Sequence, residues 1–88
     1  MSLQFPNPSR SYDPTSGNVS FWGYDDAIEV IFFIDAGALE KLRPETTKIE
    51  KSALETFDSA TKQIHETATK IYGKGRKKYS HQLAAKDF

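Results

Sequence analysis

The sequence contains no cysteine, and this absence removes three kinds of chemistry. Without thiols the chain forms no disulfide, offers no thiolate to a metal ion and has no cysteine nucleophile. Two histidines are present, His65 and His81, and neither belongs to an H-x-x-x-H or H-E-x-x-H pattern. Because a metal site needs several ligands that converge at about 2 Å, both histidines are expected to be structural or solvated, and no metal or cofactor is predicted.

Long apolar runs are also missing. No stretch approaches the roughly 20 apolar residues that a membrane-spanning helix requires. The first ten residues, MSLQFPNPSR, contain neither the basic region nor the apolar region of a secretory signal peptide. We therefore expect no membrane association, and a cytoplasmic location is the default expectation.

The net charge is zero, but the charges are unevenly distributed. Residues 1–44 carry a net charge of −3 and residues 45–88 carry +3, and no acidic residue lies between positions 67 and 85. Lysines neutralise phosphates and tyrosines stack on bases, so this stretch is a candidate for binding nucleic acid or another anion. The pI of about 6.7 favours a solvated connection instead, since nucleic-acid-binding domains tend to be strongly basic. The candidate contacts are Lys70, Lys74, Arg76, Lys77 and Lys78.

The length of 88 residues predicts a single domain over residues 1–88. A chain of this size buries only about 60–65% of the surface that its unfolded form exposes, which leaves a thin stability margin. Dimerisation is a common way for small domains to bury more surface.

The first third of the chain predicts strands separated by turns. The sequence DPTSGN is typical of a turn, and Asp25-Asp26 forms a second, tighter connection. β-branched and aromatic residues dominate the segments on either side of Asp25-Asp26. The predicted segments are an extended lead-in at residues 1–8 and strands at residues 9–13, 18–24 and 27–34.

Two helices follow in the prediction. Asp35 is placed to cap a short helix over residues 36–42, which Pro44 ends. A long helix over residues 48–72 is expected from apolar residues that recur at spacings of three and four. Its stripe consists of Ile49, Ala53, Phe57, Ala60, Ile64, Ala68 and Ile71.

The ends of the predicted long helix also carry residues typical of helix caps. Thr47 and Glu50 match a capping box, and Gly73 is a natural residue just past the C-terminus. Residues 77–85 then predict a final strand. The order β-β-β-α-α-β favours an α+β fold, in which a short and a long helix pack on one face of a small antiparallel sheet.

Strand parity divides the central hairpin into two faces. With a two-residue loop at Asp25-Asp26, Trp22 pairs with Glu29. One face is then wholly apolar or glycine and is expected to form the core under the long helix. The other face is mixed but rich in aromatics, and its candidate interaction residues are Trp22, Tyr24, Glu29, Ile31 and Phe33.

Three occupants of this second face stay open at this point. Phe5 or Phe88 from the ends of the chain could fold over it, a second copy could cover it, or it could be a site for another partner. Glu29 would be costly on such a face without a partner, and Arg10 or a C-terminal lysine is the expected one.

Several stretches together resemble a known family. They are FPNPSRSYD, VSFWGYDDAIEVIFFI, FDSATKQIHETATKIY and YSHQLAAKDF. The chain resembles, over nearly its whole length, a family of short bacterial proteins catalogued as domain of unknown function 1488. The resemblance implies a small α+β protein and implies no activity, cofactor or catalytic residue.

The expectation from the sequence is therefore a non-enzymatic interaction or accessory module that forms a homodimer through the second face. Nucleic-acid binding by the basic segment is the alternative. A small enzyme or ligand binder at Trp22, Glu29 and Phe33 is the third possibility, because a carboxylate in an apolar pocket can have a perturbed pKa.

Overall fold

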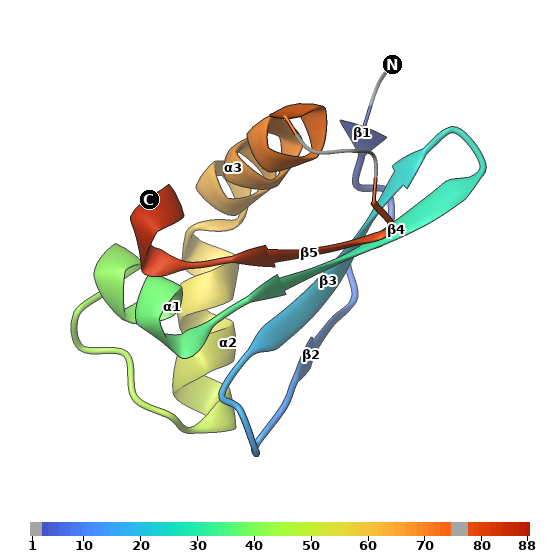
Figure 1. Cartoon of the computed structure of the whole chain (residues 1–88). Helices are drawn as coiled ribbons and strands as arrows, with labels where there is room; N and C mark the ends of the chain where they lie inside the picture. The colour runs from blue at the N-terminus through green and yellow to red at the C-terminus, as the bar shows by residue number, and fades with distance from the viewer. Residues whose placement is uncertain (1–2, 75–77) are drawn as a thin grey trace.

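Strands β3 (Val19–Asp25) and β4 (Ile28–Ile34) form the antiparallel hairpin at the centre of the sheet in this computed structural model, which describes residues 3–74 and 78–88 (Figure 1). The strand order is β1-β3-β4-β5, and β2 pairs with β3 on the same side as β1. The other elements are β1 (Leu3–Gln4), β2 (Arg10–Tyr12), α1 (Ala36–Leu42), α2 (Glu50–Ser59), α3 (Thr61–Lys74), β5 (Ser80–Leu83) and the 3-10 helix η1 (Ala85–Asp87).

The hairpin loop lies one residue later than predicted. Asp25 is the last residue of β3 and pairs with Ile28, so the loop residues are Asp26 and Ala27. Asp26 has a φ of 55°, in the left-handed region that aspartate tolerates better than most residues. Trp22 consequently lies opposite Ile31 and not opposite Glu29. This shift is two positions along β4, so every residue keeps its predicted face.

The sheet is mixed, which corrects the predicted antiparallel sheet. β5 runs parallel to β4, and Ile31 lies opposite Ser80. The chain leaves the end of β4, passes through α1, α2 and α3, and returns to the end where β4 began (Figure 1). A crossover of this kind is what parallel neighbours require.

The predicted long helix is two helices, broken at Ala60. Ser59 Oγ donates to the carbonyl oxygen of Thr56 at 2.9 Å, and Thr61 Oγ1 donates to that of Phe57 at 2.9 Å. Hydroxyls that bond to carbonyls in the preceding turn compete with the helical ladder and bend it. Ala60 itself has a φ of −119° and a ψ of 19°, outside helical values.

The predicted helix ends are partly wrong. Asp35 caps α1 as expected, because its carboxylate accepts from the N–H of Ala38 at 2.8 Å. The capping box at Thr47 is absent, however, since Ile49 occupies the N-cap position of α2 without a side-chain bond. Ile49 is also 63% exposed, so it does not belong to the buried stripe. Gly73 lies inside α3 and not past its end.

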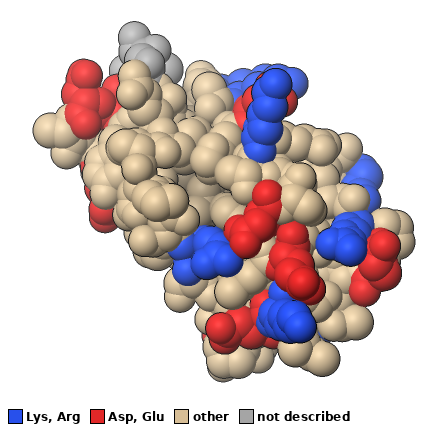
Figure 2. Space-filling view, turned by 180° about the vertical axis from the view of Figure 1, so that it is seen from behind, with Lys and Arg blue, Asp and Glu red and all other residues tan. Residues whose placement is uncertain are grey.

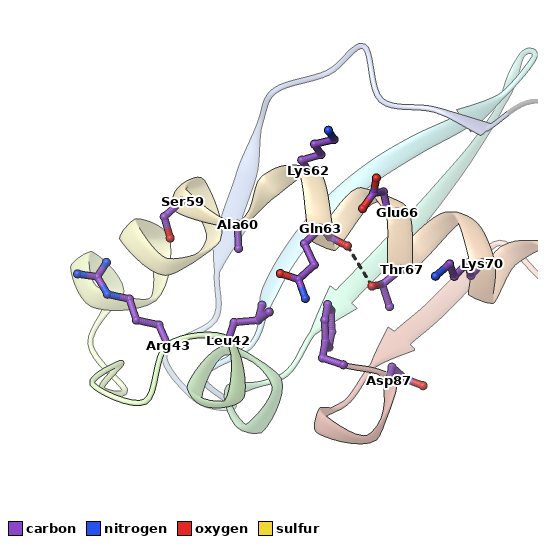
Figure 3. Close-up of a pocket in the computed structure, with 11 residues that line it drawn as sticks. Leu42, Arg43, Ser59, Ala60, Lys62, Gln63, Glu66, Thr67, Lys70 and Asp87 are labelled. Atoms are coloured by element: carbon purple, nitrogen blue, oxygen red, sulfur yellow. Dashed lines mark hydrogen bonds between the residues drawn. The ribbon is translucent and has the colours of Figure 1, made fainter.

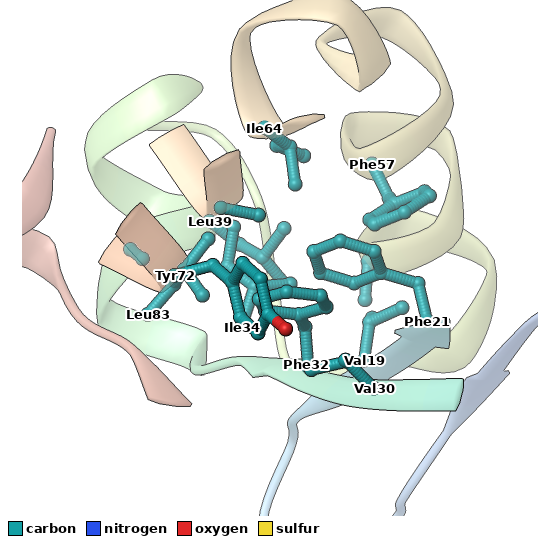
Figure 4. Close-up of a cluster of buried hydrophobic side chains, with 13 residues drawn as sticks. Val19, Phe21, Val30, Phe32, Ile34, Leu39, Phe57, Ile64, Tyr72 and Leu83 are labelled. Atoms are coloured by element: carbon teal, nitrogen blue, oxygen red, sulfur yellow. The ribbon is translucent and has the colours of Figure 1, made fainter. Parts of the chain in front are cut away.

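The core lies between the sheet and the helices. Figure 4 shows Phe21 and Phe32 from the sheet and Phe57 and Ile64 from the helices, all pointing into one cluster. The rings of Phe21 and Phe32 stack with centroids 5.3 Å apart, and Phe57 approaches Phe21 at the same distance. Each fully buried large side chain contributes about 1.5–3 kcal/mol before the cost of ordering it.

The predicted lead-in contains a short strand and a bulge. β1 and β2 both pair with β3. Residues 5–9 connect β1 to β2, but only two residues of β3 separate the position that pairs with the end of β1 from the position that pairs with the start of β2. The surplus chain loops outward and brings Phe5 over the helix side of the sheet, where it packs at 6.0 Å from both Phe21 and Phe32. Among the residues that the structure describes, no helix is long and apolar enough to cross a membrane.

Candidate interaction surface

The face of the sheet opposite the helices carries all five predicted interaction residues. Trp22 lies directly opposite Ile31, Tyr24 opposite Glu29, and Phe33 opposite Ser20. We call this surface the open face. It consists of Ser20, Trp22, Tyr24, Glu29, Ile31 and Phe33, and the parallel register adds Ser80 and Gln82 from β5.

The centre of the open face is apolar. Trp22, Ile31 and Phe33 are half-buried, whereas their neighbours Phe21 and Phe32 are fully buried under the helices. The three side chains shield one another across β3 and β4, because directly opposed residues in a sheet lie about 4.5–5.5 Å apart. Their outer surfaces form an apolar row with polar residues around it.

Neither Phe5 nor Phe88 covers the apolar row. Phe5 stacks on the ring of His65 in α3, with centroids 3.9 Å apart and an interplanar angle of 8°. Phe88 packs against the core cluster and lines a hollow between α1 and α3. The expectation that Phe5 or Phe88 folds over the second face is therefore wrong, because both rings find apolar partners on the helix side.

Glu29 has a different partner from the one predicted. Tyr24 donates its hydroxyl to Glu29 Oε2 at 2.7 Å, while Arg10 forms two hydrogen bonds with Asp58 of α2, at 2.9 and 2.8 Å. The bond to Glu29 raises the pKa of the Tyr24 phenol above its ordinary value of 10.0. A neutral donor leaves the charge of Glu29 intact, so the rim of the open face is negative at this end.

The N-terminal segment touches the open face at the same end. Gln4, Pro6, Tyr24 and Asp26 line a shallow hollow of about 350 Å³ beside the hairpin loop. The Tyr24–Glu29 pair is therefore flanked by the segment.

The basic segment extends from the C-terminal half of α3 to the residues before β5 in the part that the structure describes. Lys70 lines a hollow of about 840 Å³ between α1, α3 and η1, whose border also carries Glu66 and Asp87 (Figure 3). Lys74 ends α3 and Lys78 precedes β5. In Figure 2, acidic and basic side chains are interspersed on the face seen from behind. The remaining candidates, Arg76 and Lys77, lie outside the described residues.

Both histidines have structural contacts. His81 Nε2 donates to the carbonyl oxygen of Lys78 at 2.9 Å, and its ring meets Tyr72 edge-on. Among residues 3–74 and 78–88 no cluster of three potential metal ligands occurs. Tyr72 donates its hydroxyl to Asp25 Oδ2 at 2.7 Å, a bond that no local pattern could predict because the two residues are distant in the chain.

The burial of His65 leads to a pH-dependent stability. Burial lowers the pKa of the His65 imidazole below its ordinary value of 6.5, so the unfolded chain binds the proton more readily than the folded protein. The free energy of unfolding is expected to fall as the pH drops below about 6.5, towards the folded pKa.

Urea unfolding at several pH values between about 7.5 and 5 measures how the free energy of unfolding changes with pH. This range lies above the titration of most carboxylates. The variant His65→Gln, which cannot titrate, should show a flatter dependence. An equal slope in the variant would contradict the assignment to His65.

Comparison with known proteins identifies the family of the chain. The family model described as Protein of unknown function (DUF1488) matches residues 3–83. No curated protein matches the chain, and no solved structure does. The match covers every strand and helix described above except η1, and the chain belongs to the DUF1488 family.

Proposed function

We propose that this protein is a non-enzymatic interaction module that self-associates through its open face. The observation that carries the proposal is the apolar row of Trp22, Ile31 and Phe33 on a sheet face that no helix among residues 3–74 and 78–88 covers. Apolar surface of this kind on a small domain is favourable to bury against a partner.

The distribution of apolar and polar residues on the open face resembles that of a protein–protein interface. Its centre is apolar and aromatic, and Ser20, Glu29, Ser80 and Gln82 surround the centre with polar groups. Interfaces typically have such an apolar core and polar rim. Two copies related by a two-fold axis would place their sheets face to face at about 10 Å, with the same residues buried on both sides.

The test is the mass of the protein in solution. Sedimentation equilibrium or light scattering should give twice the monomer mass for the wild type. Phe33→Glu, which places a charge in the centre of the row, should weaken the dimer by more than about tenfold. Trp22→Ala should also weaken it, because it removes the largest apolar side chain of the row.

Ile49→Glu is the matched control. Ile49 is an exposed apolar residue at the start of α2, on the opposite side of the sheet, and its replacement should leave the mass unchanged. Circular dichroism should show that each variant keeps the fold. A wild-type protein that is monomeric at all concentrations would refute the proposed self-association.

A further inference from the structure

The two edges of the sheet are built differently. On the β1/β2 edge, Pro6 and Pro8 lie in the bulge between the two strands and Arg10 is held by Asp58. Prolines, bulges and charged residues are the devices that prevent an edge from pairing with another strand. The β5 edge has none of them, because Ser80–Leu83 is a regular strand with neither proline nor a formally charged residue.

Two residues of β5 direct their backbone N–H and C=O groups away from β4. Ile31 N–H bonds to the carbonyl of Tyr79 at 2.9 Å, and Asp35 N–H to that of Leu83 at 3.0 Å. Since backbone groups alternate along a strand, the residues that bond to β4 are 79, 81 and 83. Ser80 and Gln82 therefore direct their N–H and C=O groups away from β4. Within the described chain no strand lies beyond β5, and both residues are exposed.

Lysines lie near both ends of this edge. Lys78 is exposed two residues before β5, with Lys74 at the end of the adjacent helix α3. At the other end Lys41 Nζ donates to the carbonyl of Ala85 at 3.1 Å, and Lys86 is exposed in η1. The carboxylates of Asp35 and Asp87 lie at this second end, where each accepts a backbone N–H and Asp35 also accepts from Gln82 Nε2 at 3.5 Å, so this end carries charges of both signs.

The charges decide between two kinds of partner strand. In an antiparallel pairing of β5 with β5 of a second copy, Lys78 would face a segment with no acidic residue, because none lies between positions 67 and 85. An extended segment with acidic residues at the end beside Lys78 has the opposite charge there, and attraction would add to the main-chain hydrogen bonds.

We infer that the β5 edge binds an extended acidic peptide segment of a partner protein, which adds to the sheet as a further strand. Ser80 and Gln82 supply the main-chain hydrogen bonds, and Lys78 attracts the acidic end of the segment. Strand addition of this type derives its affinity from the backbone and its specificity from flanking side chains. This inference does not rest on the proposed self-association, which uses the face of the sheet and not its edge.

The probe is a capped peptide that matches residues 78–85 in length, with two glutamates at each end of an alternating Val–Thr core. Fluorescence anisotropy of the labelled peptide should show binding that weakens when salt rises from about 50 mM to about 500 mM, as screening requires. In ¹⁵N spectra the amides of Ser80 and Gln82 should shift on binding and become protected from exchange.

Two variants separate the backbone from the charges. Gln82→Pro removes an outward N–H and should weaken binding more than about tenfold. Lys78→Glu should weaken it about threefold to tenfold, while Lys51→Glu on α2 should leave it unchanged. A peptide with proline in its core tests the same hydrogen bonds without altering the protein, and it should fail to bind.

Trp22→Ala should bind the peptide as the wild type does, because Trp22 lies on β3 and the substitution adds no charge, which keeps this test independent of self-association. Equal binding of the proline-containing peptide would show attraction between charges alone and would overturn the inference. Binding of labelled DNA with no binding of the peptide would also overturn it, in favour of a nucleic-acid partner.

Discussion

Replacing Phe32 by alanine is expected to lower the free energy of unfolding by about 3–5 kcal/mol. Phe32 is fully buried and stacks on Phe21, and its ring also lies within 6.0 Å of Phe5 and 5.6 Å of His81 by centroid distance. Its removal would leave a cavity in the core between the sheet and the helices. Because the total stability of such a domain is about 5–15 kcal/mol, much of the population could unfold. Urea unfolding followed by circular dichroism measures the loss.

The adjacent Phe33 provides the control, since it differs from Phe32 mainly in the face on which it lies. Phe33→Ala should cost no more than about 1–2 kcal/mol, because its ring is half-buried on the open face. The measurement should be made at low protein concentration, where self-association contributes least. Equal losses for the two variants would contradict the assignment of the faces.

Replacing Gly23 by alanine is expected to destabilise the protein by about 1–3 kcal/mol. A Cβ atom at this position would lie 3.0 Å from Phe5 Cε1, 3.1 Å from Leu3 Cδ1 and 3.2 Å from Phe32 Cε2. The N-terminal segment would have to move away from the sheet, because Phe32 is held on all sides. Chemical denaturation gives the loss, and the ¹H shifts of the Phe5 ring report whether the ring has moved.

Gly37→Ala is the matched control for this substitution. Gly37 lies in α1, and a Cβ there would meet only Asp35 Oδ1 at 3.5 Å, an ordinary contact. Alanine is the better helix former by about 1 kcal/mol, so this variant should be more stable than the wild type. Opposite signs for the two glycine variants are the expected result, and a stabilised Gly23→Ala would refute the packing of Phe5.

The face assignment of the hairpin could be predicted from the sequence although its loop could not. Alternation along a strand has a period of two, and any even shift of register preserves it. Trp22 and Phe33 were therefore placed on the correct face even though Asp26 and Ala27, and not Asp25 and Asp26, form the loop. Local patterns also predicted the short helix α1 with its Asp35 cap.

Features that depend on distant contacts could not be predicted in this way. The apolar stripe continues in phase through Ala60, and the bond from Thr61 Oγ1 to Phe57 that accompanies the break leaves no trace in hydrophobic periodicity. The direction of β5 depends on the path of three helices. The position of Phe5 depends on Gly23, whose missing side chain matters only once the two segments meet.

The parallel pairing of β4 with β5 has a consequence for the order of folding. The hairpin of β3 and β4 closes over a loop of two residues. The other edge of β4 pairs only when residues 80–83 meet residues 31–34. Contacts of large sequence separation form slowly, since the closure of the long loop is unfavourable until they are made. During synthesis the hairpin therefore emerges well before its last neighbour, and β4 remains an unpaired, strongly apolar edge in the interval. We expect the nascent chain to be most prone to aggregation in that interval, after Ile34 has emerged and before Leu83 does.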